Sequence, residues 1–322
     1  MSIPPRILER AKRNRRRIVF PESLDERILR AAAEAVSEDL CTPILIGDPS
    51  EIEEKSKEVG VDLSGMELID LRKFERFHEY VAMYAEMRGK SERIARRILS
   101  KPIYFAVMMV KMGDADAVIA GASTITATVI RAGRLIIGLQ EGVSVPSSFF
   151  LMEVPGFDRL LFFADAAVNP DPTSEQLADI AIVTGRSYKT VLGLEPRIAL
   201  LSFSTKGSAS HPMVDKVVKA VKIAKDKAPD LMIDGELQAD AALIPEIAER
   251  KLGEKSPVAG KANVLIFPDL NSGNIGYKLV QHLARARAYG PILQGFKKPI
   301  SDLSRGAKVE DIVGAIAILA AQ

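Results

Sequence analysis

Short apolar runs alternate with longer segments of helical period along most of the chain, and this alternation constrains the fold more than any other feature. In the first half, runs with the length and composition of strands lie at residues 17–21, 42–47, 67–71 and 117–120. Between the first two runs, residues 25–36 place Ile28, Leu29 and Ala32 on one helical face. Strands that alternate with helices predict an α/β protein with mostly parallel sheets.

The same alternation resumes after residues 143–146. Further strands are expected at residues 149–154, 160–164, 197–202, 231–234 and 264–267. Helices are expected at residues 73–112 and 124–137 in the first half and at 174–190, 212–227 and 277–288 in the second. A chain of 322 residues is longer than one core usually organises. We therefore expect two domains, with a crossing near residues 143–146.

The charge is nearly balanced, with a formal net charge of +2. The one basic cluster, Arg13 with residues 15–17, precedes the apolar residues 18–20, so we interpret it as the solvated face of a first helix. This distribution does not indicate a nucleic-acid partner. No apolar run is long enough to span a bilayer, and no signal-peptide h-region is evident. We expect a cytoplasmic protein without a membrane partner.

Cys41 is the only cysteine, which excludes an intramolecular disulfide and Cys–Cys metal motifs. No metal site is expected. The stretch 204–208 (STKGS) lacks the order of a nucleotide-triphosphate loop. A nicotinamide-dependent dehydrogenase is disfavoured, because the chain has no well-placed G-x-G-x-x-G and no obvious carboxylate cluster for a divalent metal.

The segment 299–306 (PISDLSRG), followed by Asp311, combines three chemically useful groups within a short turn and the start of a helix. Ser304 supplies a hydroxyl, Arg305 a guanidinium and Asp311 a carboxylate. The planar fork of arginine fits phosphate oxygens, and a turn before a helix directs free N–H groups outward. The segment predicts a site that handles anions.

This segment and three further regions resemble the phosphate acetyltransferase (phosphotransacetylase) family. The matching stretches are 165–180 (DAAVNPDPTSEQLADI), 202–209 (SFSTKGSA) with 235–243 (GELQADAAL), 263–279 (NVLIFPDLNSGNIGYKL), and 290–295 (GPILQG) with 298–306. The resemblance covers nearly the whole chain. It implies the reversible reaction of acetyl-CoA with phosphate to give acetyl phosphate and CoA, a step of acetate metabolism.

The resemblance also implies an architecture. It is similar to that of isocitrate and isopropylmalate dehydrogenases: two three-layer α/β/α sandwiches with the active-site cleft between the domains. The helix expected at residues 309–321 would return to the first domain. That domain would comprise residues 1–145 and 297–322, and the second would comprise 146–296.

By resemblance, Asp311 is the general base that deprotonates the CoA thiol. An ordinary aspartate is about 4 to 5 pKa units too weak, so full proton transfer would be roughly 6 kcal/mol uphill. Either burial raises the pKa of Asp311, or attack accompanies the transfer. An acidic residue in a first helical turn also simply complements the helix dipole, and that alternative stays open.

Arg305 would bind the phosphoryl group or stabilise the oxyanion, unless it forms a surface ion pair with Asp302. Ser304 would donate a hydrogen bond to the thiolate or the oxyanion. It is not expected to be a covalent nucleophile, because no His or Lys in the motif could activate it.

CoA carries a 3′-phosphate and a pyrophosphate, so several cations are needed to bind it. The resemblance assigns Arg131 and Arg88 to substrate or CoA binding, and Arg27 as a weaker candidate. Arg88, among charged neighbours, could equally be only a solvated side chain.

The stretch 121–126 (GASTIT) follows a strand and opens a helix, so its N–H groups could cradle an anion. The glycine could also merely permit a tight turn. The family pattern at this position carries over to Gly121, Ala122 and Thr126, whereas Ile125 replaces the first of a pair of threonines.

Two other positions depart from the common family pattern. Ser301 stands where Asn is usual, and Ala307 stands where some members have Cys. Because Cys41 lies outside every matching stretch, an acetyl-cysteine intermediate is disfavoured. Direct thiolate attack within a ternary complex is expected instead.

The resemblance implies no tightly bound cofactor, CoA and acetyl-CoA as substrates, stimulation by a monovalent cation, and a homodimer. The small-molecule partners would be acetyl-CoA, phosphate, acetyl phosphate and CoA. Two alternatives remain open: a phosphate butyryltransferase-like acyltransferase and a non-catalytic regulatory protein that binds acetyl-CoA.

Overall fold

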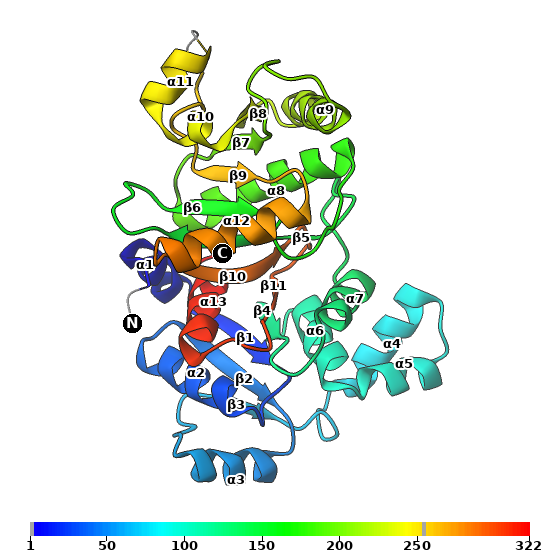
Figure 1. Cartoon of the computed structure of the whole chain (residues 1–322). Coiled ribbons are helices and arrows are strands. Elements are labelled where there is room, and N and C mark those ends of the chain that lie inside the picture. The colour runs from blue at the N-terminus through cyan, green and yellow to red at the C-terminus, as the bar shows by residue number, and fades with distance from the viewer. Residues whose placement is uncertain (1–2, 253–255) are drawn as a thin grey trace. The chain divides into compact units, whose positions relative to one another are not determined.

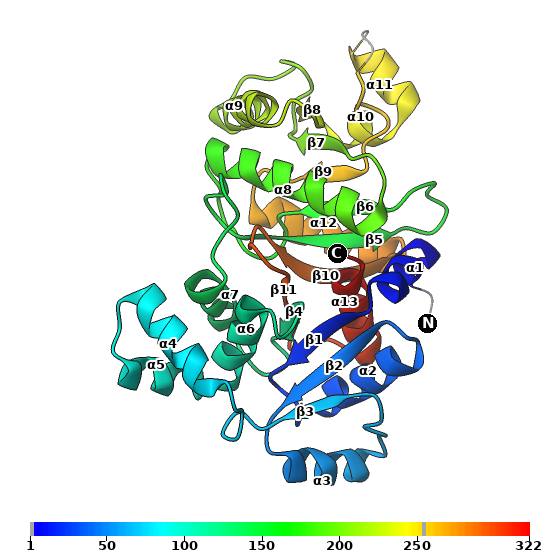
Figure 2. The same ribbon diagram turned by 180° about the vertical axis from the view of Figure 1, so that it is seen from behind.

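The structure is a computed structural model that describes residues 3–252 and 256–322. The chain forms two compact units, shown in Figures 1 and 2. The first comprises the chain up to Gly138 together with Phe296–Gln322, and the second comprises Leu139–Gly295. Parallel sheets with helices between successive strands occur in both units, which confirms the predicted α/β class.

The first unit contains a five-stranded, all-parallel sheet in the order β11-β4-β1-β2-β3. Its strands are β1 (Arg16–Phe20), β2 (Cys41–Ile46), β3 (Glu67–Ile69), β4 (Ala117–Ala120) and β11 (Ile300–Asp302). Its helices are α1 (Pro5–Asn14), α2 (Glu26–Ser37), α3 (Pro49–Val59), α4 (Phe77–Arg88), α5 (Glu92–Leu99), α6 (Pro102–Met112), α7 (Thr126–Ile136) and α13 (Val309–Ala321).

Helix α13 is apolar on all sides and is buried from Ile312 to Ala321, as expected for a helix inside a core. It contacts α1, α2 and the central strands β1 and β4. Both views show α2 and α13 on the same face of this sheet (Figures 1 and 2). The last segment of the chain therefore completes the core of the first unit.

One predicted helical region is interrupted in the structure. Residues 73–112 form three helices, α4, α5 and α6, rather than one extended segment. Gly89 ends α4 with a φ of +57°, a left-handed conformation that glycine adopts without a steric penalty. Pro102 begins α6, because proline suits a first helical turn and cannot continue a preceding helix.

The second unit contains a six-stranded sheet in the order β10-β5-β6-β9-β7-β8. Its strands are β5 (Ser147–Glu153), β6 (Leu161–Ala164), β7 (Arg197–Leu201), β8 (Met232–Leu237), β9 (Val264–Ile266) and β10 (Arg287–Gln294). Its helices are α8 (Ser174–Leu192), α9 (Pro212–Lys227), α10 (Ala239–Leu243), α11 (Pro245–Leu252) and α12 (Leu270–Leu283). Strands β6, β9, β7 and β8 run parallel, whereas β5 pairs antiparallel with both β10 and β6.

The helix predicted at residues 277–288 was wrong at both ends. Helix α12 begins at Leu270, where the Asp269 side chain accepts the N–H of Ser272, and it ends at Leu283. The edge strand β10 then begins at Arg287. Its pairing with β5 is irregular between Tyr289 and Ile292, around a proline that cannot donate to the ladder.

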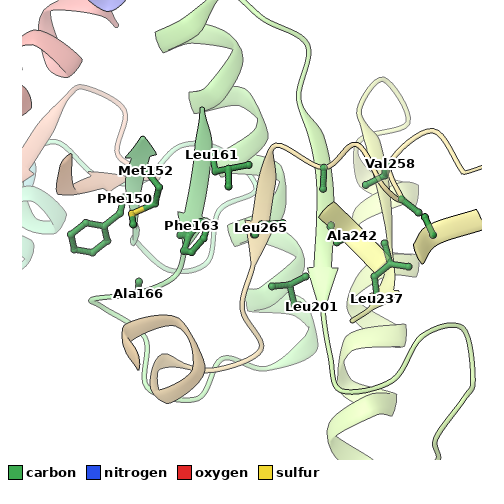
Figure 3. Close-up of a cluster of buried hydrophobic side chains, with 14 of the residues drawn as sticks. Phe150, Met152, Leu161, Phe163, Ala166, Leu201, Leu237, Ala242, Val258 and Leu265 are labelled. Carbon is green, nitrogen blue, oxygen red and sulfur yellow. The ribbon is translucent and has the colours of Figure 1, made fainter. Parts of the chain in front are cut away.

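A hydrophobic cluster covers one face of the second sheet, and Figure 3 shows the side chains of Phe150, Met152 and Phe163 within it. Helix α12 packs against this cluster through Tyr277, whose ring stacks on Phe150 with centroids 4.0 Å apart. Within the described residues, no helix has both the length and the hydropathy that crossing a bilayer requires.

Candidate active site

The predicted catalytic motif lies at one edge of the parallel sheet of the first unit. Strands β1, β4 and β11 all end at this edge, because they run parallel. They lead into Glu22, Gly121 and Ser304, respectively. Strands β2 and β3 extend the sheet to one side of β1, while β4 and β11 extend it to the other. Ligands of open α/β sheets bind at such a reversal of strand order.

The turn that follows β11 presents Ser304 and Arg305 to solvent. The N–H of Leu303 donates to the carbonyl oxygen of Ala120 on β4 at 2.8 Å, which fixes the start of the turn. The N–H of Ala307 donates to the carbonyl oxygen of Ser304 at 2.8 Å, and the N–H of Gly306 reaches Ser304 Oγ at 3.3 Å. The exposed hydroxyl and guanidinium therefore stand on an ordered backbone.

The guanidinium of Arg305 has no hydrogen bond or ion pair with any residue that the structure describes. The alternative ion pair with Asp302 is not formed, because the Asp302 carboxyl is buried and bonded to Thr126 instead. Arg305 thus keeps its planar fork of donors free for an anion.

Arg27 has the opposite character, because every N–H of its guanidinium has an acceptor within the chain. Nε and one Nη2 hydrogen bind the carboxylate of Asp25 at 3.0 and 2.7 Å. Nη1 donates to the carbonyl oxygens of Arg305 and Ala307 at 2.8 and 3.0 Å, and Nη2 also donates to that of Ala122 at 3.0 Å. Arg27 therefore fastens the start of α2 to the Ser304–Arg305 turn and to the loop after β4.

The amides of the loop after β4 already have an anionic partner, which is Glu22. Glu22 Oε2 accepts the N–H groups of Gly121 and Ala122, both at 2.8 Å. Glu22 Oε1 accepts those of Ser123 and Thr124 at 2.9 and 2.5 Å, and also the Ser123 hydroxyl at 2.9 Å. The N–H groups that the sequence suggested as a cradle for substrate are thus occupied by a carboxylate of the chain itself.

The pKa of Glu22 reflects this environment. Burial alone raises it, but the hydrogen bonds from Ser123 and Thr124 outweigh burial and bring the pKa below its ordinary value. Glu22 is therefore a fixed negative charge at this edge of the sheet. No signal in the sequence marked it, apart from its position directly after a strand.

Gly121 lies where the loop passes very close to β11. Its φ is +112°, and a Cβ atom there would come within 2.6 Å of the backbone nitrogen of Leu303. Only glycine fits this combination of conformation and close approach. Gly121 was expected either to help cradle an anion or to permit a tight turn, and the structure provides a steric reason for the tight turn.

Thr126 is the first residue of α7, and its hydroxyl donates to Asp302 Oδ2 at 2.5 Å. Asp302 is 3% exposed, and its second oxygen, Oδ1, has no hydrogen-bond partner among the described residues. Burial raises the pKa of Asp302 to about 6, and the charge of Glu22 acts in the same direction. From the sequence, Asp302 was expected only as an ion-pair partner of Arg305, and no pattern marked its buried position.

Arg131 on α7 and Arg88 at the end of α4 are exposed, and neither guanidinium has a partner among the described residues. Burial raises the pKa of Tyr84, and the positive charges of Arg88 and Arg131 both oppose that rise. The fold therefore brings these two arginines near the same phenol. In the sequence, the proximity of Tyr84 and Arg88 is indicated only by their spacing of four residues, which is about one helical turn.

Asp311 lies in the first turn of α13 and is partly buried. Its Oδ2 accepts the N–H of Lys308 at 2.9 Å, which is a helix-capping interaction. Its Oδ1 has no hydrogen bond to the described residues. The structure therefore assigns a capping role to one oxygen and leaves the other available.

Two clefts open along the same edge of the sheet. A cleft of about 550 Å³ is lined by residues after β1 and β2, among them Glu22, Asp25 and Glu51. Beside it, a cleft of about 500 Å³ includes Arg72 and Arg96. The predicted binding residues Arg88 and Arg131 line neither cleft.

A similar internal carboxylate occupies the STKGS stretch of the second unit. Glu236 Oε1 accepts the Ser204 hydroxyl at 2.9 Å and the N–H of Gly207 at 2.7 Å. Lys206 binds Asp234 Oδ1 at 2.5 Å. Within the described parts of the chain, no group of three or more His, Cys, Asp or Glu side chains is placed to hold a metal ion.

Comparison with known proteins gives a consistent result. The family described as "Phosphate acetyl/butaryl transferase" matches residues 2–320. The phosphate acetyltransferase of Thermoanaerobacterium thermosaccharolyticum is 49% identical over 100% of this chain and 99% of its own length. That of Acetivibrio thermocellus is 45% identical over 100% and 98%. The crystal structure of a phosphotransacetylase from Streptococcus pyogenes superposes with a TM-score of 0.92 at 43% identity, covering 100% of this chain and 98% of that one. The chain belongs to the phosphate acetyl/butyryl transferase family.

Proposed function

We propose that the protein is a phosphate acetyltransferase, which interconverts acetyl-CoA and phosphate with acetyl phosphate and CoA. The observation that carries the proposal is the free guanidinium of Arg305, exposed beside Ser304 in the turn after the edge strand β11. The activity named for the relatives at 45–49% identity supports the choice of substrates.

In the direction of acetyl-CoA synthesis, the CoA thiol transfers its proton to the free Oδ1 of Asp311. The sulfur attacks the carbonyl carbon of acetyl phosphate, so that a C–S bond forms and the carbonyl oxygen becomes an oxyanion. Collapse of this intermediate breaks the C–O bond to phosphate. In this proposal, proton transfer accompanies the attack on the carbonyl carbon, so that no free thiolate has to form first.

Arg305 stabilises the phosphoryl group as it leaves, and the hydroxyl of Ser304 donates to the thiolate or the oxyanion. Donors placed where charge develops are typically worth about 3 to 4 kcal/mol each. Both side chains are exposed, and their backbone is fixed by Arg27 and by the Leu303–Ala120 hydrogen bond. The ordered turn supports such a preorganised role.

Arg131 and Arg88 bind the phosphates of CoA in this proposal, because both guanidiniums are unpaired and lie near Tyr84. Arg27 contributes by holding the turn. Gly121 and Ala122 keep the loop after β4 in place, because their N–H groups donate to Glu22. Thr126 keeps α7 in place through its hydrogen bond to Asp302. Direct attack in a ternary complex is supported by Cys41, which is buried and whose pKa is raised to about 12 by burial.

We further propose that the two compact units are the two domains expected from the sequence. The protein is cytoplasmic, has no tightly bound cofactor, and is stimulated by a monovalent cation.

We also propose that the protein is a homodimer. A row of apolar residues on α12 supports self-association: Ile275, Leu279 and Leu283 are 56%, 52% and 80% exposed and share one helical face. Leu283→Lys should shift the dimer to monomers in sedimentation analysis. Val218→Lys, at an exposed position on α9, should leave it a dimer.

The activity is tested by following the acetyl-CoA thioester upon addition of phosphate. Phosphate-dependent loss of the thioester supports the proposal, and faster loss with butyryl-CoA would establish a phosphate butyryltransferase instead. Binding of acetyl-CoA without turnover of any acyl-CoA would contradict the enzymatic proposal and favour a regulatory protein.

A further inference from the structure

Asp302 ends strand β11, and its carboxyl group turns inward beneath the loop that follows β4. Its Oδ2 accepts the Thr126 hydroxyl at 2.5 Å, while Oδ1 is buried and has no partner among the described residues. Gly121 leaves no room for a side chain between that loop and Asp302. The carboxyl is therefore confined within the core of the site rather than exposed at its surface.

A buried carboxylate oxygen without a donor is unusual, because buried polar groups are almost always hydrogen-bonded. The cost is largest when the carboxylate is charged, since desolvation penalises the ionised form. Burial accordingly raises the pKa of Asp302 to about 6, and Glu22, after β1, adds to the rise. The Thr126 hydroxyl on α7 opposes the rise most, and the N–H of Leu303 opposes it through proximity only, because its hydrogen bond goes to the carbonyl oxygen of Ala120. Asp302 thus titrates about two pH units above an ordinary aspartate, near pH 6.

Asp302 also joins two parts of the proposed site. Helix α7, which it holds through Thr126, carries Arg131, and the turn directly after it carries Ser304 and Arg305. A phosphate bound at Arg305 would add negative charge a few residues from this carboxyl. That charge favours the protonated form of Asp302, and by linkage protonation favours the bound phosphate.

We propose that Asp302 is a positioning residue that couples α7 to the Ser304–Arg305 turn, and that it takes up a proton when phosphate binds. This inference rests on the proposed phosphate-dependent activity. The ionised form places a second negative charge near Glu22 and weakens the hold on phosphate, while the protonated form removes it. The proton comes from solvent, and no covalent bond changes.

The test compares the unmodified protein with Asp302→Asn, which keeps the size of the side chain but cannot ionise. Near pH 7.5 the variant should have a KM for phosphate lower by about fivefold, whereas near pH 5 the two proteins should agree. The KM for CoA should change by less than about twofold. Because phosphate itself titrates in this range, only the difference between the two proteins is used.

Calorimetry provides a readout independent of turnover. Phosphate binding is measured in two buffers of different ionisation enthalpy, and the unmodified protein should take up more protons than Asp302→Asn. At pH 5, where Asp302 is protonated with or without the Thr126 hydroxyl, Thr126→Val should raise the KM for phosphate because the link to α7 is lost. Thr128→Val, two residues further along α7, should leave it unchanged.

Equal proton uptake by both proteins, or the same fold-change in KM at every pH, would overturn the inference and leave Asp302 a purely structural residue. Should Asp302→Asn fail to fold, the Thr126→Val and Thr128→Val pair decides the coupling, because equal KM values for phosphate would reject it. An unmodified protein that binds phosphate but does not turn over acyl-CoA would contradict the proposed function and not this inference, since the calorimetric comparison still applies.

Discussion

The guanidinium of Arg27 donates a hydrogen bond of 2.8 Å to the backbone carbonyl oxygen of Arg305. One arginine of the site thereby holds the other in place. Arg27 uses all its donors within the chain, whereas Arg305 offers all of its own to solvent. The two residues are of the same type, yet the structure gives them different tasks, and these can be separated by experiment.

Substitution of Arg27 should impair both stability and turnover. Arg27→Ala leaves the carbonyl oxygens of Arg305, Ala307 and Ala122 without their donor, and it should lower the free energy of unfolding by about 1–3 kcal/mol. The main kinetic effect should fall on kcat, because the turn loses its position. Denaturant unfolding and steady-state kinetics check this. A variant with normal stability and a raised KM for CoA alone would instead indicate a direct ligand.

Substitution of Arg305 should impair turnover without affecting stability. Its side chain is exposed and has no partner among the described residues, so Arg305→Ala removes no contact that holds the fold. We expect kcat/KM for phosphate to fall by about 10²- to 10³-fold. Arg305→Lys should recover only part of this loss, since an ammonium cannot form the bidentate contact. An activity within about twofold of the unmodified protein would reject the proposed role.

Helix α7 offers a matched pair of arginines for testing CoA binding. Arg131 and Arg134 are both exposed and unpaired among the described residues, but only Arg131 lies close enough to affect the pKa of Tyr84. Arg131→Ala should raise the KM for CoA by about tenfold, and Arg134→Ala should leave it unchanged. Comparison with dephospho-CoA would then identify whether the 3′-phosphate is the group bound. Equal effects at both positions would indicate general electrostatic attraction only.

Glu22 should stabilise the protein above acidic pH. Its pKa is lower in the folded state, so its contribution is fully present above the unfolded pKa of about 4.5 and is lost as the pH falls through the folded pKa. Glu22→Gln should therefore cost about 1–3 kcal/mol near neutral pH. The two proteins should converge at low pH in unfolding experiments. A constant difference at all pH values would contradict an ionic role.

Cys41 should be inert in the folded protein. It is 9% exposed, and burial raises its pKa to about 12, so almost no thiolate is present at neutral pH. Iodoacetamide should leave the native activity intact and should label Cys41 only after denaturation. Cys41→Ala should remain active. Inactivation of the native protein in parallel with labelling of Cys41 would instead support an acetyl-cysteine intermediate.

The regular elements were predictable from the sequence where local pattern and burial agree. Strand β4 was predicted at residues 117–120 and has those bounds, because its four residues are apolar and fully enclosed. The short strand β11 was not predicted. Its three residues carry little pattern of their own, and they form a strand because they pair with β4, which lies far away in the sequence.

The site was predictable to a smaller extent. The motif identified Ser304, Arg305 and Asp311 as candidate residues, but the sequence could not indicate the partners of the charged groups. Glu22 binds amides that lie about a hundred positions further along the chain, and this contact exists only once β1 and β4 are neighbours. In the folded chain the guanidinium of Arg27 donates to other residues, whereas that of Arg131 has no partner among the described residues.

The late position of β11 and α13 in the chain has a consequence during synthesis. The second unit is one continuous segment, so its residues leave the ribosome before the first unit has its edge strand and its most apolar helix. Domains generally fold in the order in which they are made, but here the unit that starts first is completed last. Until residues 296–322 emerge, β4 has an unpaired edge that invites association with other chains. The residues proposed for catalysis therefore emerge together with the strand and the helix that complete the first unit.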